Sequence, residues 1–323
     1  MKCLSNRLAA LGALSSLVAI LAVALASPRA LAVELTRSVR SGPWSAASTW
    51  EAGRAPPEGS RVHIRSGHRV IYDLESKEPM RSIHISGTLT FARDRSTRLE
   101  VGLIRIDREP PGETDEGFEC AHETPSSEPP HAGSERPALE IGTREQPIPR
   151  EHRALVRLVF FEGMNEESLP AIVCCGGRMD LHGAPLRRTW VKLAEPASVG
   201  DTRIFLAEEV DWRVGDRVVI TATSRQRPFA GNSSPHVTDR PASEERTITA
   251  IIDPSARTMM EAGAVIVVDR PLAHPHRAEE GYAAEVANLS RNVVIESADP
   301  DRARGHTMYH RHSRGAISYV ELR

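Results

Sequence analysis

The stretch from Ser41 to Gly87 is built from short runs of alternating apolar residues that glycines interrupt. It opens with two tryptophans, Trp44 and Trp50, followed by a Pro-Pro-Glu-Gly turn. The runs 61–64 and 69–74 then flank Ser66-Gly67-His68, which predicts a hairpin-like turn. Strands of about four to six residues closed by glycine favour stacked rungs of a solenoid, because an inward ladder of Ile, Leu and Val is buried and glycine turns the corners. A β-sandwich would give the same periodicity, so it remains open as an alternative.

The same pattern continues along the chain and predicts an all-β fold. Further strands are expected at 83–85, 88–91, 99–106, 138–143, 154–161, 171–183, 189–193, 198–206, 210–223, 247–252, 265–272, 282–290, 292–297 and 316–323. The stretch 108–137, rich in Pro, Glu, Ser and Gly, is expected to be a surface insertion between rungs, because its composition cannot form a core. Residues 166–290 are expected to form a small β-barrel or sandwich block inserted into the rungs or lying beside them.

The N-terminal residues 1–32 have the layout of a signal peptide. Lys2 and Arg7 precede an apolar run over 8–26, and Ala-x-Ala sites end at Ala26 and Ala32. An uncleaved anchor helix is the alternative, since the run is almost long enough to span a bilayer. Cleavage would leave a secreted or periplasmic protein with no membrane segment.

The composition limits which partners the protein can attract and which side chains can form its core. Aromatic residues make up 4% of the chain, so its core must consist of aliphatic side chains. The formal net charge of −2 gives no overall field that would attract nucleic acid, and any polyanion site would need a local basic cluster.

Removal of the leader would leave three cysteines, Cys120, Cys174 and Cys175. In an oxidising compartment, the sequence predicts a disulfide from Cys120 to one member of the vicinal pair. Buried thiols are the alternative, and a redox or metal role is a third. No second cysteine pair with zinc-ligand spacing exists, so no metal or other cofactor is expected. A calcium site built from turn carboxylates such as Asp201, Asp211 and Asp216 is a lesser possibility.

The order of several motifs resembles that of G-eight domain proteins, a family named for its eight glycines. The segments that carry the resemblance are the Trp44/Trp50 opening with its Pro-Pro-Glu-Gly turn, Ser66-Gly67-His68, Ile85–Leu89, LEIGT at 139–143, MDLHG at 179–183, WVKL at 190–193, DWRVGD at 211–216 and the final segment 305–323. The order of the motifs resembles that of the group that includes hyaluronan-binding and hyaluronidase members and their bacterial relatives.

The resemblance implies a right-handed parallel β-helix with an extracellular polysaccharide or glycosaminoglycan, such as hyaluronan, as its partner. It implies a G-eight domain at 41–165, the β-rich block at 166–290 and further rungs from 291 to 323. Similar proteins continue for several more rungs, so it also implies that a sequence stopping at Arg323 is C-terminally truncated. Some members depolymerise hyaluronan, while others, such as the fibrocystin group, are not known as enzymes.

The segment 305–314 is the densest candidate site. On one regular strand, His306, His310 and His312 would share a face, joined by Arg314. Such a face could hold a carboxylated sugar, supply a general base or bind a metal; it could also be an ordinary polar surface.

Asp180 and His182 form a second candidate, since a carboxylate two residues away can orient an imidazole. They could equally serve as turn residues. Trp44 and Trp50 could stack on sugar rings, although a cap over the first rung explains them better.

Three functions remain open on these grounds: a secreted polysaccharide-binding protein, a hyaluronidase-like depolymerase, and a non-catalytic adhesion scaffold.

Overall fold

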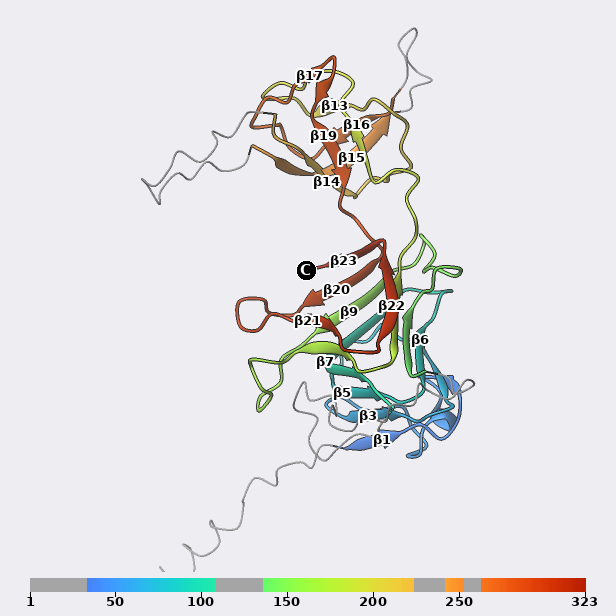
Figure 1. The fold of residues 1–323 in the computed structure, drawn as a ribbon. Coiled ribbons are helices and arrows are strands. Elements are labelled where there is room, and N and C mark those ends of the chain that lie inside the picture. Colours follow the sequence, from blue (N-terminus) through green and yellow to red (C-terminus); the bar gives the residue numbers. More distant parts are fainter. Residues whose placement is uncertain (1–33, 109–135, 224–241, 253–262) are drawn as a thin grey trace, which may run out of the picture. The chain divides into compact units, whose positions relative to one another are not determined.

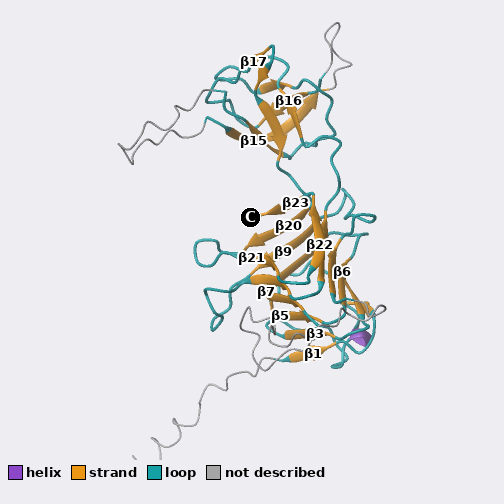
Figure 2. Ribbon diagram, viewed as in Figure 1, coloured by secondary structure: helices purple, strands orange, loops and turns teal. Residues whose placement is uncertain are grey.

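The computed structural model describes residues 34–108, 136–223, 242–252 and 263–323. The expected leader, Cys120 and nearly all of the polar insertion lie outside the described residues. Residues 35–323 form one compact unit. Strands account for nearly all of its regular structure, and the one described helix is the 3-10 turn η1 (Ala47–Thr49), drawn in purple in Figure 2. Among the described residues, no helix has the length and apolarity needed to cross a bilayer.

The chain forms two parallel sheets, and from β1 to β9 each strand lies in the other sheet from the strand before it (Figure 1). The first sheet contains β1 (Leu35–Arg37), β3 (Arg61–Ile64), β5 (Met80–Ile85), β7 (Thr97–Ile106), β9 (Ala154–Leu158), β10 (Ala171–Cys174), β20 (Val293–Ser297), β21 (His306–Tyr309) and β23 (Val320–Leu322). The second sheet runs in the order β2 (Gly42–Pro43), β4 (Arg69–Tyr72), β6 (Thr88–Phe91), β8 (Ala138–Ile141), β11 (Arg178–His182) and β22 (Arg314–Ser318).

The turn at Ser66-Gly67-His68 joins the two sheets and does not form a hairpin. Strand β3 pairs in parallel with β1 and β5, whereas β4 pairs in parallel with β2 and β6. The next corner stacks closely on this one. A Cβ at Gly87 would lie 2.3 Å from the carbonyl oxygens of both Arg65 and His68, so only glycine fits there. The expected hairpin is therefore corrected to a corner, because each strand finds its partner in the next turn of the chain.

Parallel register places like residues above one another and builds one core, in which aliphatic side chains predominate. Ile64 aligns with Ile85, which aligns with Ile106, and all three are fully buried. Leu89, Leu139 and other inward residues of the second sheet belong to the same cluster. Alternation then places the intervening polar residues on the outer faces of the sheets.

The ten-residue strand β7 divides the first sheet into two branches. Its first half pairs with β9, and its second half pairs with β10. Strand β20 stacks on β9, while β21 stacks on β10. Leu158, at the end of β9, thus lies at the fork between the branches.

An antiparallel sheet is inserted between β11 and β20. Its order is β12 (Trp190–Lys192), β19 (Glu285–Asn288), β14 (Arg217–Ile220), β15 (Glu244–Ile252), β16 (Val265–Val268) and β13 (Arg203–Phe205), with a separate two-stranded pair, β17 (Ala278–Glu279) and β18 (Tyr282–Ala283). This sheet has its own apolar core around residues such as Val191, Val218 and Ile266. The block expected at 166–290 starts later, because β10 and β11 join the parallel sheets.

A buried polar network lies within this block. The Glu244 carboxylate accepts hydrogen bonds from the backbone N–H groups of Ala273 and His274, each at 2.8 Å, and from Arg246. A ring nitrogen of His276 lies 3.1 Å from the same carboxylate, and the other ring nitrogen lies 2.8 Å from the carbonyl oxygen of Thr221. Because the charges are paired and hydrogen-bonded, they can be buried.

Candidate functional site on the outer face of the second sheet

The histidine-rich segment does not form one strand. Strand β21 ends at Tyr309, a turn follows, and β22 begins at Arg314 in the other parallel sheet. His312 has a φ of 63° within this turn. The turn stacks on the corner below, where the Ser313 hydroxyl donates to the carbonyl oxygen of Cys174 at 2.7 Å and accepts from the N–H of Gly176 at 3.0 Å.

This corner separates the predicted histidine face. His306 lies on β21 in register with Ala171, His310 follows that strand, and His312 is an exposed turn residue. Arg314 starts the next strand in the second sheet. The expectation that these four residues share one face is therefore corrected, since the chain turns between the sheets within the segment.

The corner instead brings Arg314 beside a different predicted residue. Arg314 aligns with Arg178, and Asp180 aligns with Ala316, two residues further along the strand. On the other side, Asp180 aligns with Glu140 of β8. The neighbours Leu139, Ile141, Met179 and Leu181 point into the core, so these charged residues lie on the outer face.

We call Arg69, Glu140, Arg178, Asp180 and Arg314 the charged ladder. Glu140, only 4% exposed, binds Arg69 with one carboxylate oxygen and Arg178 with the other. Arg178 also donates to Asp180. Burial opposes the charge of Arg178, but its bonds to Glu140 and Asp180 prevail and raise its pKa. The two carboxylates thus hold two guanidinium groups in fixed positions on the sheet.

Arg314 differs from the other two arginines of the charged ladder. It is exposed, and its guanidinium makes no hydrogen bond or ion pair with any residue that the structure describes. Three arginines and two carboxylates leave the ladder with an excess positive charge, located at Arg314. A group of this kind is available to bind a carboxylate or sulfate.

Asp180 and His182 share the outer face, as their spacing predicts, but no hydrogen bond joins these two described side chains. Asp180 accepts from Arg178 and from the N–H of Ala316 at 3.1 Å. His182 is buried, and its Nδ1 lies 2.6 Å from the Ser318 hydroxyl. Each side chain is held by a different partner, which leaves no carboxylate–imidazole pair at this position.

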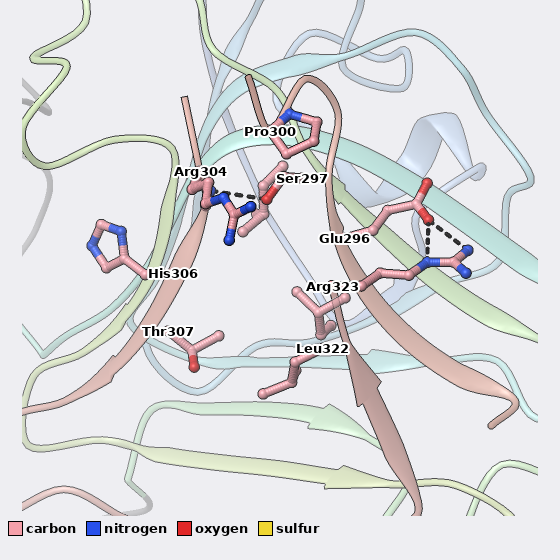
Figure 3. A pocket seen from close by; sticks show the side chains of 11 residues that line it. Glu296, Ser297, Pro300, Arg304, His306, Thr307, Leu322 and Arg323 are labelled. Atoms are coloured by element: carbon pink, nitrogen blue, oxygen red, sulfur yellow. Dashed lines mark hydrogen bonds and ion pairs between the residues drawn. The ribbon is translucent and has the colours of Figure 1, made fainter. Parts of the chain in front are cut away.

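A cavity of about 650 Å³ lies at the fork of the first sheet, as Figure 3 shows from close by. Leu158, Ile295 and Leu322 supply apolar walls, while Arg304, His306 and Thr307 supply polar groups. Burial lowers the pKa of His306. Figure 3 also shows the Arg323 guanidinium turned to Glu296, with donor–acceptor distances of 3.0 and 2.9 Å. Because Arg323 is already paired, Arg304 is the cation of this cavity that could meet an anion.

The two N-terminal tryptophans belong to the core. Trp44 and Trp50 are 1% and 2% exposed. Buried rings have no face to offer to a sugar, so their predicted stacking role is corrected in favour of packing at the start of the parallel sheets.

The vicinal cysteines differ in state. Cys175 is disulfide-bonded, whereas Cys174 is a buried free thiol whose pKa is raised by burial. Cys120, the predicted partner, lies outside the described residues. No group of three or more His, Cys, Asp or Glu within the described ranges is arranged to hold a metal ion.

Three members of the charged ladder were missed by sequence reasoning: Arg69, Glu140 and Arg178. A signal was present, since Glu140 interrupts the apolar strand Ala138-Leu139-Glu140-Ile141, and Arg178 and Asp180 alternate with Met179 and Leu181. A charge in the middle of an apolar strand marks its outer face, but the sequence does not show which strands lie side by side.

Comparisons with known proteins identify one domain of the chain. Residues 49–194 match the family model described as the G8 domain. Fibrocystin-L of Mus musculus is 26% identical over 268 residues, covering 79% of this chain and 5% of that protein. Fibrocystin of Mus musculus is 26% identical over 282 residues, covering 81% and 6%. A G8 domain-containing protein of Dictyostelium discoideum is 34% identical over 131 residues, covering 41% and 10%.

These relatives are much longer than the chain, which spans a tenth of their length or less. The matched region contains most of the charged ladder and ends shortly after β12. The G-eight resemblance is thus borne out at the level of the domain, because residues 49–194 of the chain match the G8 domain model.

Proposed function

We propose that this protein binds an acidic extracellular polysaccharide, such as hyaluronan, along the outer face of its second parallel sheet. The observation that carries the proposal is that Arg314 is exposed, has no side-chain partner among the described residues and lies beside the fixed guanidinium of Arg178. Adjacent strands are about 4.8 Å apart, so Arg69 and Arg178, three strands apart, are separated by about 14 Å at the backbone. A row of this length suits a polymer that carries repeated carboxylates.

We also infer that the two parallel sheets are faces of a β-helix. The support is that strands β1 to β9 alternate between the two sheets and that every pairing between described strands in these sheets is parallel. An experimental structure in which β3 and β4 paired as a hairpin would overturn this assignment.

An exported location is part of the proposal. Its support is the leader-like sequence of residues 1–32 together with the disulfide-bonded state of Cys175. N-terminal sequencing of protein recovered outside the cytoplasm should find a mature chain that starts after Ala26 or Ala32. A full-length chain retained in the cytoplasm would contradict this location.

The direct test of binding is affinity chromatography of the purified full chain on immobilised hyaluronan, with neutral dextran as the comparison polymer. Retention on hyaluronan and not on dextran is expected, with elution by salt because the contacts are exposed and screened. Arg314→Gln should weaken binding about fivefold, as expected from the ~1 kcal/mol of an exposed ion pair.

Arg311→Gln is the matched control, since Arg311 is an exposed arginine of the adjoining turn outside the charged ladder. If Arg314→Gln and Arg311→Gln weakened binding equally, the charged ladder would not be the site. If the wild type were not retained on hyaluronan at all, the proposed function would be wrong. Size analysis of the eluted hyaluronan separates a binding protein from a depolymerase. Chain shortening that Arg314→Gln abolishes would replace the binding proposal by an enzymatic one.

A further inference from the structure

Trp190 is the exception among the four tryptophans of the chain. Trp44, Trp50 and Trp212 are at most 4% exposed, whereas Trp190 is 51% exposed. It is the first residue of β12, where alternation turns Val191 into the core and leaves Trp190 on the outer side. An exposed ring of this size is costly to hydrate, and one found beside a groove is a candidate for ligand contact.

A groove of about 260 Å³ lies next to this ring. Its lining includes Arg188, Thr189, Glu208 and Tyr319 besides Trp190. Arg188 is ion-paired with Glu208, and the carbonyl oxygen of Arg188 accepts a hydrogen bond from the buried Trp212 indole at 2.8 Å. The polar wall of the groove is therefore held in place by its own contacts. The volume is below that of pockets that enclose a drug-sized ligand, and it suits a single ring.

The backbone at the groove is strained at one residue. Tyr319 has a φ of 53°, in the left-handed region that residues other than glycine rarely adopt. The corner is fixed by close packing, because a Cβ at Gly183 would lie 2.1 Å from the carbonyl oxygen of Tyr319. A strained residue that is held in place at a surface groove is a feature typical of ligand sites.

We propose that this groove is a subsite for one pyranose ring of the polysaccharide, with Trp190 as the stacking platform. A sugar ring offers an apolar C–H face to the indole, and its hydroxyl groups can bond to the Arg188–Glu208 pair and to the Thr189 hydroxyl. This inference rests on the proposed function and adds a site that lies apart from the charged ladder. Trp190 supplies ring recognition there, while the ladder supplies charge recognition.

Tryptophan fluorescence tests the subsite directly, because the exposed part of the emission comes from Trp190. The full chain is titrated with hyaluronan hexasaccharide, and separately with maltohexaose, in the presence of acrylamide as quencher. Hyaluronan hexasaccharide should reduce quenching about twofold at saturation. Trp190→Ala should lower the affinity about fivefold to tenfold, and Trp190→Phe should recover part of the loss, since aromatic contacts are worth about 0.5–1.5 kcal/mol beyond their buried area.

Tyr282→Ala is the matched control, because Tyr282 is also 51% exposed but does not line the groove. The subsite would be overturned if the wild type bound hyaluronan without any reduction of acrylamide quenching and Trp190→Ala bound it with wild-type affinity. The proposed function would still stand in that case. If maltohexaose reduced quenching and hyaluronan hexasaccharide did not, the groove would still be a sugar subsite, but the proposal that the ligand is acidic would be wrong. No binding of either sugar by the wild type would overturn both.

Discussion

The indole N–H of Trp50 donates a hydrogen bond to the backbone carbonyl oxygen of Trp44 at 2.7 Å. The two ring centroids are 4.9 Å apart in an edge-to-face arrangement, and Trp44 meets Tyr72 in the same way at 5.3 Å. The contacts connect the irregular N-terminal segment to β4 and bury one face of the first strands.

Replacement of Trp50 by alanine should therefore cost about 3–5 kcal/mol of unfolding free energy, because it leaves a cavity and removes a buried hydrogen bond. Urea denaturation of the variant measures the loss. Trp190→Ala, at an exposed ring, serves as the comparison and should change stability by less than about 0.5 kcal/mol. A similar cost for both variants would argue against the core role of Trp50.

Removal of the charge of Glu140 should have opposite effects on stability and on binding. Glu140→Gln breaks the carboxylate contacts of Arg69 and Arg178, and a loss of about 1–3 kcal/mol is expected in urea denaturation. The variant frees the Arg69 guanidinium, leaves Arg178 bonded to Asp180 alone and removes one negative charge, so a higher salt concentration should be needed to elute the protein from hyaluronan. Glu100→Gln, which breaks a similar pair with Arg98 on the first sheet, should leave elution unchanged. Earlier elution of Glu140→Gln would count against the charged ladder.

Glu244 should make the antiparallel sheet sensitive to acid. Burial alone would raise the pKa of this carboxylate, but the backbone N–H groups of Ala273 and His274, with His276 and Arg246, lower it from 4.5 to about 2. A lowered carboxylate pKa stabilises the fold above pH 4.5, and that stabilisation is lost as the pH falls towards 2.

The Glu244→Gln variant should consequently be about 3–5 kcal/mol less stable at pH 7, because a buried Arg246 loses its partner. Below pH 3 the two proteins should differ much less. Thermal unfolding across this range checks the convergence, and a difference that stays constant with pH would contradict it.

His63 should add a second pH dependence in a higher window. Burial, with help from His84 and nearby arginines, lowers the pKa of His63 from 6.5 to about 4. The neutral ring lies 3.1 Å from the Ser86 hydroxyl. The contribution of His63 to the stability of the fold is present above pH 6.5 and is lost as the pH falls to 4, because the unfolded chain takes up the proton first.

In His63→Gln, the decline of stability between pH 6.5 and 4 should be shallower than in the wild type. His274→Gln, at an exposed side chain, should keep the wild-type slope. Denaturation midpoints in urea at four or five pH values measure both slopes. Parallel curves for His63→Gln and the wild type would show that His63 is not the group responsible.

The strands of the fold could be predicted from local patterns, but their pairing could not. Alternation and glycine placed Arg61–Ile64 and Arg69–Tyr72 correctly as strands. The turn between them was predicted as hairpin-like, because the short polar connection has the same composition as a corner between two sheets. Only the partners supplied by later strands distinguish the two, and those contacts are distant in sequence.

For the candidate site too, single residues could be predicted from the sequence, but their neighbours on other strands could not. Asp180, His182 and Arg314 could be singled out by residue type, and Asp180 and Arg314 belong to the charged ladder. The predicted alignment of His306, His310 and His312 failed at a corner that has Ser313 at its centre. Glu140 could not be joined to Arg69 beforehand, because β6 lies between their strands and the pairing order was unknown.

The pairing of β9 with β20 sets a constraint on how the chain can reach its final state. Ala154 aligns with Val293, and the whole antiparallel sheet is encoded between them. During synthesis, β9 leaves the ribosome long before its partner, so one edge of the first sheet stays open while the antiparallel sheet is being made. Such open edges invite pairing with other chains. The protein should consequently depend on rapid folding of the antiparallel sheet, because this folding brings the two ends of the insert together and allows β20 to pair with β9.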